Sequence, residues 1–246
     1  MGDSPMPNNL SPEQQARLEA EVYPLERAAF QHRQNREWKQ DIALQREALT
    51  LREAIAGPVN ETLAGGLVSL AIDLRDTGQY EEAEALFLRG LSIYEALYGP
   101  THREMATALF WLGCLYDEWE RYNMSLPVYR RALAMEERIY GKRSREVAAT
   151  CTWLGDAHVE LSQYARAEPY FRRAAEIHQA RRTWQGTAPL ALIQERLAGT
   201  LFRLKRQCQA LVAYQDVLAL NKGRFRWPQS RRRFNLCRAR CTSATE

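Results

Sequence analysis

The stretch from Leu112 to Gly141 reads LGCLYDEWERYNMSLPVYRRALAMEERIYG, and its skeleton occurs three times in the chain. The copy 42 residues upstream, from Leu70 to Gly99, reads LAIDLRDTGQYEEAEALFLRGLSIYEALYG. The copy 42 residues downstream, from Leu154 to Thr183, reads LGDAHVELSQYARAEPYFRRAAEIHQARRT. A fixed period of this size is typical of an array of stacked structural repeats.

The positions that the three copies share carry a leucine, several small residues and one aromatic ring. In the central copy they are Leu112, Gly113, Ser125, Tyr129 and Ala132. The equivalents are Leu70, Ala71, Ala83, Phe87 and Gly90 upstream, and Leu154, Gly155, Ala167, Phe171 and Ala174 downstream. Small residues let two helices approach closely, and one ring per repeat fills the space between neighbours. The pattern therefore predicts a pair of packed helices in each copy.

These residues resemble the tetratricopeptide repeat (TPR), a helix-turn-helix unit, in the longer form found in kinesin light chains and many bacterial repeat proteins. The resemblance covers roughly residues 38–221 of the sequence. It implies an all-α fold, a right-handed α-solenoid of stacked antiparallel helix pairs. It also implies that the first helix of each pair lines a concave face and that the second helix forms the outer wall.

The repeat pattern divides the chain into seven parts. They are a disordered N-terminus (1–10), a degenerate N-terminal capping repeat (11–57), three full repeats (58–99, 100–141 and 142–183), a divergent fourth repeat (184–222) and an Arg-rich C-terminal tail (223–246). In the full repeats we expect first helices at about 60–77, 102–119 and 144–161, and second helices at about 80–98, 122–140 and 164–182. The fourth repeat follows after a shift of one residue.

The segment before the full repeats carries its own helix signals. Ser11, Pro12 and Gln14 match a helix start, with Ser11 as N-cap, Pro12 at the first helical position and Gln14 reaching back to the cap. Pro24 lacks the backbone donor that a helix interior needs, so we expect a kink or break near Tyr23.

Composition limits the class of protein. The chain has 246 residues, of which 46% are apolar and 26% charged, but no run of about 18 apolar residues that would cross a membrane. The N-terminus has no basic flank and no apolar core of a secretory signal, so a cytoplasmic location is expected. The five cysteines include no CxxC pair, and we expect neither structural disulfides nor a metal or other cofactor.

The residue just before the shared leucine is a ligand-contacting position in the family that the repeats resemble. Here it reads Ser69, Trp111, Trp153 and Arg196. Because Trp111 and Trp153 lie one repeat apart, we expect their rings about 10 Å apart on neighbouring first helices, as a shelf for a peptide side chain. The alternative is that both rings fold down and fill space between the repeats.

Four carboxylates accompany the two tryptophans on the same first helices: Asp117, Glu118, Asp156 and Glu160. Carboxylates beside aromatic rings suit a basic or aromatic-basic peptide, through charge pairing and cation–π contact. The same acidic groove would also suit the Arg-rich tail of this chain. In a third interpretation the acids lie on a solvated rim, where ion pairs contribute little.

The sequence departs from two known ligand classes of the family. Kinesin light chains carry Asn at the position of Trp111 and Trp153 and hold a peptide backbone with it. The chaperone-binding class instead clamps a terminal carboxylate with Lys, Asn and Arg, whereas this chain has Val68, Ile72 and Ala149 at corresponding places. Both ligand classes are therefore disfavoured.

The C-terminal segment is strongly basic. From Lys222 to Glu246 it carries eight positive charges against one negative charge. Its arginines include Arg224, Arg226, Arg231, Arg232 and Arg233, which are candidates for contact with nucleic acid. The alternatives are a solvated extension or one more capping helix around the sequence FNLCRAR.

The sequence does not predict an enzyme. His32, His102, His158 and His178 are scattered, and no phosphate loop, HExxH or GxSxG motif is present. We expect a non-catalytic interaction scaffold or adaptor that is monomeric or weakly self-associating, binds no membrane and holds a peptide segment of a partner protein in its groove. A nucleic-acid-associated regulator that uses the Arg-rich tail, and an assembly subunit that uses the ends of the array, are the alternatives.

Overall fold

The computed structural model describes residues 11–180, 188–221 and 228–242, and within these ranges all regular secondary structure is α-helical. The chain divides into two compact units, Met1–Arg121 and Tyr122–Glu246. Among the described helices, none combines the length and the apolar character needed to cross a lipid bilayer. The predicted disordered segment 1–10 lies outside the described residues.

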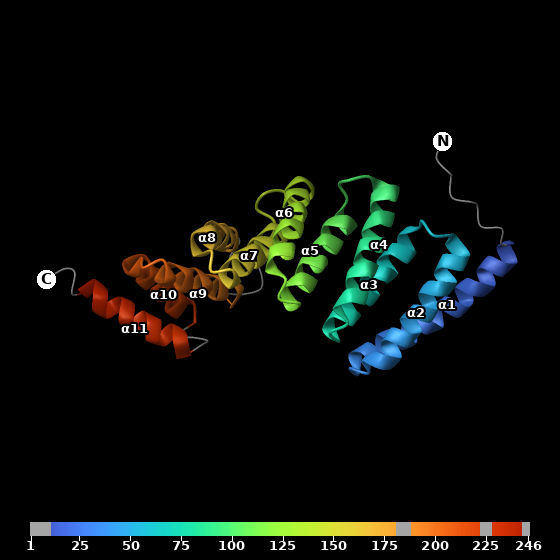
Figure 1. Cartoon of the computed structure of the whole chain (residues 1–246), viewed down its shortest axis with the longest axis horizontal. Coiled ribbons are helices and arrows are strands. Elements are labelled where there is room, and N and C mark those ends of the chain that lie inside the picture. The colour runs from blue at the N-terminus through green and yellow to red at the C-terminus, as the bar shows by residue number, and fades with distance from the viewer. Residues whose placement is uncertain (1–10, 181–187, 222–227, 243–246) are drawn as a thin grey trace. The chain divides into compact units, whose positions relative to one another are not determined.

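In the described part of the first unit, residues 11–121, five helices pack in succession (Figure 1). They are α1 (Pro12–Gln34), α2 (Trp38–Ala56), α3 (Glu61–Asp76), α4 (Tyr80–Tyr98) and α5 (Arg103–Glu118). Each helix packs against the next one along the chain, and α3 also contacts α5. Contact between α3 and α5 is expected when first helices of neighbouring repeats stack.

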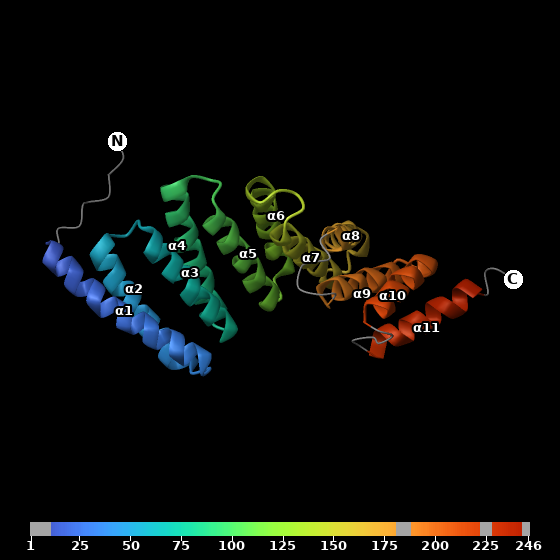
Figure 2. The ribbon, with the colours of Figure 1, turned by 180° about the vertical axis from the view of Figure 1, so that it is seen from behind.

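Six helices are described in the second unit, within residues 122–180, 188–221 and 228–242 (Figure 2). They are α6 (Tyr122–Ile139), α7 (Arg145–Glu160), α8 (Tyr164–Ala180), α9 (Ala188–Arg203), α10 (Gln207–Leu220) and α11 (Pro228–Thr242). Successive helices from α6 to α11 pack together, and α11 packs on both α10 and α9. The prediction of an all-α fold built from helix pairs is confirmed, and the described part of the Arg-rich tail is a packed helix.

The same tight turn closes the first helix of every pair. Its marker is a residue with positive φ, and these residues are Arg36, Gly78, Glu120, Ser162 and Lys205. A backbone N–H just after each marker donates to a carbonyl five residues back, at 2.7–3.0 Å, as in Gln79 to Leu74 and Arg121 to Tyr116. The markers recur every 42 residues until the last interval of 43, so the predicted one-residue shift is seen directly.

The core forms where the repeat pattern requires it. Four rings, Phe87, Tyr129, Phe171 and Tyr214, are all fully buried. The small residues at the shared second-helix position, Ala83, Ser125, Ala167 and Ala210, are also fully buried. Gly155 shows how tight the fit is, because a Cβ atom added there would lie 2.6 Å from Cε1 of Phe171. Helices α7 and α8 approach this closely only because Gly155 has no side chain.

The predicted start of α1 is confirmed. Of the kink or break predicted near Tyr23, the break is wrong. Ser11 Oγ accepts a hydrogen bond from the Gln14 backbone at 3.2 Å, and the Ser11 backbone donates to Gln14 Oε1 at 2.8 Å. Helix α1 then runs through Pro24 to Gln34. Ala20, whose carbonyl Pro24 leaves without a helical donor, is exposed, so water can replace that donor.

We predict that Gly155→Ala lowers the free energy of unfolding by about 1 to 3 kcal/mol, because the new methyl group overlaps the buried Phe171 ring. Denaturant titration measures the change. The matched control is Gly65→Ala, where the nearest heavy atom, Tyr94 Oη, lies 3.5 Å from the added Cβ. Helix propensity should make that control neutral or more stable by up to about 1 kcal/mol. Equal stability of the two variants would argue against the close α7–α8 approach.

Candidate functional site

In the second unit, three predicted site residues share one face of α7. Trp153, Asp156 and Glu160 are spaced by three and four positions, which places them one above the other on a helix. We call these three residues the α7 face. The Trp153 side chain stacks on the Tyr129 ring of α6, with centroids 6.5 Å apart and planes at 26°, and is still 37% exposed. The ring is therefore packed in part and exposed in part.

A cavity of about 380 Å³ lies beside the α7 face, between α7, α8, α9 and α11. Asp156 forms an ion pair with Arg196 of α9 in its wall, so two residues predicted from the repeat register are brought together. Arg233 of α11 also lines the cavity. Its guanidinium lies against Gly199, where an added Cβ would be 3.1 Å from Nη1. We call this space the second-unit cavity.

The wall of the second-unit cavity carries charges of both signs. It carries Arg196, Arg203 and Arg233 against the carboxylates of Asp156 and Glu195. Asp156 is neutralised by Arg196, and Glu195 is buried. The exposed carboxylate of the α7 face is therefore Glu160, at the last residue of the helix.

In the first unit, Trp111 and Glu118 are joined by an arginine that the sequence analysis did not single out. The Arg75 guanidinium lies 5.0 Å from the Trp111 ring centroid, and its Nε lies 3.4 Å from a Glu118 carboxylate oxygen. Trp111 is half-buried and meets Phe110 edge to face, with centroids 5.4 Å apart. Burial raises the pKa of Glu118 despite the nearby arginine. Asp117, beside Glu118, is half-buried.

The expected shelf of two tryptophans stays a prediction. Trp111 belongs to the first unit and Trp153 to the second, and each ring is described within its own unit. What the structure adds is local: each ring has a packed partner on one side, Arg75 for Trp111 and Tyr129 for Trp153. At Trp153 the contact with Tyr129 coexists with an exposed fraction of 37%.

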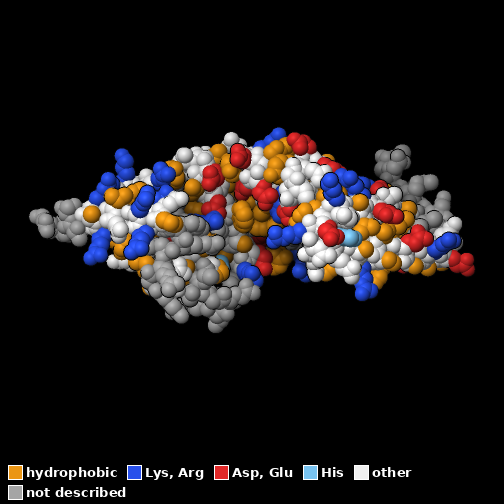
Figure 3. Space-filling model, turned by 90° about the horizontal axis from the view of Figure 1, so that it is seen from below, with side chains coloured by type: hydrophobic (Ala, Val, Ile, Leu, Met, Phe, Trp, Pro, Cys, Tyr) orange, Lys and Arg blue, Asp and Glu red, His pale blue; other side chains and the backbone are white. Residues whose placement is uncertain are grey.

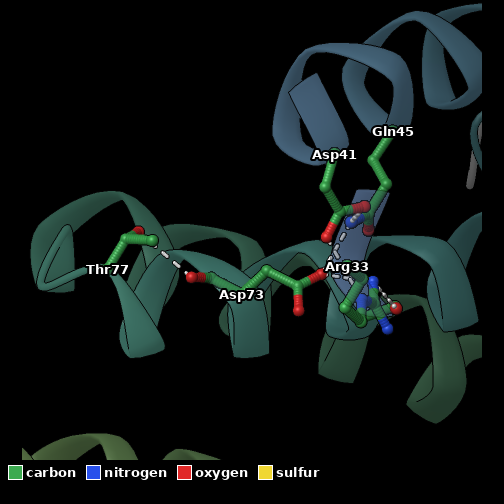
Figure 4. Close-up of polar contacts among 6 residues, drawn as sticks. Arg33, Asp41, Gln45, Asp73 and Thr77 are labelled. Atoms are coloured by element: carbon green, nitrogen blue, oxygen red, sulfur yellow. Dashed lines mark hydrogen bonds and ion pairs between the residues drawn. The ribbon is translucent and has the colours of Figure 1, made fainter. Parts of the chain in front are cut away.

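A buried polar network joins α1, α2 and α3 in the first unit (Figure 4). Arg33 Nε donates to Asp41 at 3.2 Å, and its Nη2 donates to Ser69 Oγ at 3.2 Å and to Asp73. The Gln45 amide donates to both carboxylates, to Asp41 at 2.7 Å and to Asp73 at 2.6 Å. Ser69, predicted as a ligand contact, is therefore part of this network.

The network forms one wall of a cavity of about 380 Å³ in the first unit, lined also by Phe30 and Leu49. Asp73 is 2% exposed, and its burial raises its pKa to about 6, although Gln45 and Arg33 stabilise the charged form. Two buried carboxylates thus share one guanidinium. A proton on Asp73 balances the charge of the group.

The repeat alignment contains a signal for this network that the sequence analysis passed over. Asp73 occupies the position of Leu115 and Ala157, and Asp41 occupies that of Ala83. An acidic residue at a position that is apolar and buried in the other copies needs a buried partner. Arg33 and Gln45 lie in the degenerate leading repeat, where the alignment predicts no polar partner.

Only part of the predicted nucleic-acid set can be placed. Arg224 and Arg226 lie outside the described residues. Arg231 and Arg232 are exposed on α11, whereas Arg233 is turned into the second-unit cavity. Helix α11 holds five arginines and no acidic residue. Figure 3 shows Lys and Arg side chains at the end of the second unit that α11 forms.

His158 is a buried, packed ring of α7. It is 1% exposed, stacks on Tyr170 with centroids 5.7 Å apart, and shares a hydrogen bond of 2.8 Å with Gln163. Burial lowers its pKa, which favours the neutral imidazole. In the described parts of the chain, no three His, Cys, Asp or Glu side chains gather in a way that could hold a metal ion.

Two protein-family models match the sequence, and both are described as tetratricopeptide repeat. One matches residues 62–138 and the other matches residues 148–180. A search of curated protein sequences gave no match to this chain.

Several solved structures are similar. BtubC (BKLC) from P. vanneervenii has a TM-score of 0.71 and 19% identity, over 88% of this chain and 94% of that chain. A candidate kinesin light chain from Podosopora anserina, with nearly identical TPR-like repeats, has a TM-score of 0.70 and 16% identity, over 85% and 97%. A Rap protein complexed with competence and sporulation factor has a TM-score of 0.60 and 16% identity, over 87% and 56%. At these identities the likeness concerns the fold alone.

We predict that part of the free energy of unfolding is lost as pH rises from about 4 to 6. The pKa of Asp73 is about 6 in the folded chain, against an ordinary value of 3.8. The folded state therefore binds the proton more tightly, and the stabilisation is fully present below pH 3.8 and disappears as pH rises through 6. Its size is on the order of 1 to 3 kcal/mol.

Denaturant titrations of wild type and Asp73→Asn between pH 4 and 7 measure this contribution, because the difference between their curves isolates one carboxyl group. The control Glu81→Gln removes an exposed carboxylate of α4 and should keep the wild-type slope. If the curves of Asp73→Asn and wild type run parallel over this range, Asp73 does not titrate as described.

Proposed function

Because the chain is a tetratricopeptide repeat protein, we propose that it is a non-catalytic scaffold that binds a peptide segment of a partner protein. Stacked helical repeats offer extended binding surfaces, and the TPR fold typically serves protein–protein interaction and usually carries no catalysis. The observation that carries the proposal is the half-open Trp153 ring on the α7 face.

Trp153 is suited to anchor an apolar or aromatic side chain. Tryptophan offers a large, rigid contact area and is enriched among the residues that dominate binding energy. The Tyr129 ring, itself fully buried, supports Trp153, of which 37% is exposed. Helix α7 packs against both α6 and α8, so the anchor loses little conformational entropy when a ligand binds.

The acids of the α7 face suit a basic residue next to that anchor. Asp156 already holds the guanidinium of Arg196, which is the group that a basic peptide would present. Since the wall of the second-unit cavity carries an excess of arginine, we assign the basic residue of the ligand to the exposed Glu160 instead. The proposed ligand is therefore an aromatic-basic segment that lies along α7.

The first unit has an equivalent arrangement of an aromatic ring and an acid. Trp111 is in contact with the Arg75 guanidinium, and Glu118 pairs with the same arginine. Arg75 already occupies the place of a ligand's cation here. We therefore propose that a ligand contacts Trp111, Asp117 and Glu118 separately, and more weakly than it contacts the α7 face. A protein partner is also supported by the structurally similar Rap protein, which was solved in complex with competence and sporulation factor.

We predict that Trp153→Ala weakens peptide binding by about 5- to 100-fold, which corresponds to roughly 1 to 3 kcal/mol. Peptides selected from a random 12-residue phage library against the wild-type chain provide the ligand, and fluorescence anisotropy measures its affinity. The selected peptides should combine an aromatic residue with Arg or Lys. Glu160→Gln should weaken binding by a smaller factor and reduce its dependence on salt.

The matched control is Val212→Ala, which removes an exposed apolar side chain from α10 of the same unit. It should leave the affinity unchanged, and all three variants should keep the wild-type circular dichroism spectrum. Unchanged affinity in Trp153→Ala would remove the α7 face as the binding surface. Tighter binding in Glu160→Gln would mean that the ligand is acidic rather than basic.

The alternative of nucleic-acid contact is favoured by one feature, the exposed pair Arg231 and Arg232 on a helix without acidic residues. If the pair contacts phosphates, the double variant Arg231→Gln/Arg232→Gln should weaken binding of a single-stranded oligonucleotide and reduce its salt slope by about 1 to 2. Oligonucleotide binding that is absent at about 50 mM salt, or unchanged in the double variant, would exclude this role for α11.

A further inference from the structure

Two cysteines far apart in sequence meet at the end of the second unit. The Sγ atoms of Cys208, on α10, and Cys241, on α11, lie 2.8 Å apart across a separation of 33 residues. Cys208 is exposed and Cys241 is half-buried, whereas Cys114, Cys151 and Cys237 are buried. No structural disulfide is expected from the sequence, whose five cysteines include no CxxC pair, and a contact across 33 residues leaves no mark in the spacing.

The packing of α11 explains why these thiols face each other. Cys237 is fully buried in a core cluster with Tyr214, Ala210 and Leu201. Cys241 lies four residues later and therefore on the same face of α11, one turn further along. That turn reaches the first turn of α10, where Cys208 is the second residue. Figures 1 and 2 both draw α11 beside α10 and α9.

We propose that Cys208 and Cys241 are a redox-responsive pair that closes a disulfide clasp between α10 and α11. The sulfurs are already in contact at 2.8 Å, against a bonding distance of about 2.05 Å, so the packing of the two helices brings the thiols together before any oxidation. The proposal is independent of the proposed peptide site at Trp153.

Formation of the Cys208–Cys241 disulfide needs a two-electron oxidant. We assign the role of oxidant to a small-molecule disulfide. The exposed Cys208 thiolate attacks one sulfur of that disulfide, forms a mixed disulfide and releases the first small thiol. Cys241 then attacks the Cys208 sulfur, the protein disulfide forms, and the second small thiol leaves. The two protein thiols are oxidised, the small disulfide is reduced to two thiols, and the protons of the protein thiols end on these products.

The order of the two attacks follows from the surroundings of the thiols. The hydrogen bond with Cys208 raises the pKa of Cys241 to about 11, so the Cys241 thiol is kept protonated while the contact lasts. Cys208, being exposed, is the sulfur that a small disulfide can reach. Once Cys208 is in the mixed disulfide, Cys241 is the neighbouring thiol that resolves it.

The clasp would fix α11 on the second unit. Arg233, on the same helix, lines the second-unit cavity and lies against Gly199. A covalent link at Cys241 therefore holds this wall of the cavity in place, while the reduced chain relies on the packing of Cys237 and its neighbours. The redox state of the pair would control how firmly the cavity is closed.

The test treats the full chain with oxidised glutathione, counts free thiols with a maleimide reagent of high mass, and maps the linked peptides by mass spectrometry. We expect the five thiols to become three, with one link between the peptides of Cys208 and Cys241 and no covalent dimer. The melting temperature should rise by about 5 to 10 °C and return after reduction.

Cysteine variants separate the two steps. Cys241→Ser should stop at a mixed disulfide of Cys208 with glutathione, and Cys208→Ser should keep all four of its remaining thiols free. The control Cys237→Ala should still form the Cys208–Cys241 disulfide. If that variant does not fold, the peptide map of the wild type shows which cysteine is linked to Cys208. Five free thiols after oxidation, a link between Cys237 and Cys241, or a link between two chains would each overturn the proposal.

Discussion

The close approach of paired helices, made possible by a small residue opposite an aromatic ring, is the constraint on which the second unit depends. Gly155 has no room for a methyl group because Phe171 fills the space. This contact fixes α7 against α8. The rings that make the repeat pack also build the site, since Tyr129 supports Trp153 and Phe171 lines the second-unit cavity. Stability and the proposed binding surface therefore rest on the same side chains.

Polar residues enter this packed core at places where one repeat departs from the others. Asp41 and Asp73 take positions that are small or apolar elsewhere, and Arg33 of α1 reaches both carboxylates. The network links the degenerate leading repeat to the first full one. Helix α11 acts similarly at the other end of the chain, where Arg233 and Cys237 attach it to α9 and α10. Both terminal helices are thus held by contacts that the repeat pattern alone does not contain.

The features that could be predicted from the sequence are those that recur with the 42-residue period. The helix pairs, the buried rings and the shift before the fourth repeat follow from the recurrence of Leu112, Tyr129 and their equivalents, because each position meets the same neighbours in every copy. The sequence did not predict contacts that depend on partners outside the pattern. Arg75 stacks on Trp111, and Arg196 forms an ion pair with Asp156. A long side chain can reach several neighbours in different rotamers, so its partner does not follow from its position in the repeat.

The turn between paired helices was also beyond the sequence pattern. Gly78 is the one glycine among its five markers. Glu120 and Ser162 also adopt positive φ, although neither residue type favours that conformation. Tertiary packing on both sides of the turn overrides the local preference. Pro24 is a second case, because α1 continues past it and the carbonyl that it leaves without a helical donor belongs to the exposed residue Ala20.

The most direct test of the α7 face as the partner-binding surface is site-specific photo-crosslinking in living cells. A photoreactive phenylalanine analogue replaces Glu160 on the α7 face in one strain and Gln209, an exposed residue of α10, in another. If the α7 face binds the partner, position 160 gives a covalent adduct to a peptide of a single partner protein, and position 209 gives none. Adducts from position 209 alone, or none from position 160 while the chain still binds its partner, would contradict it.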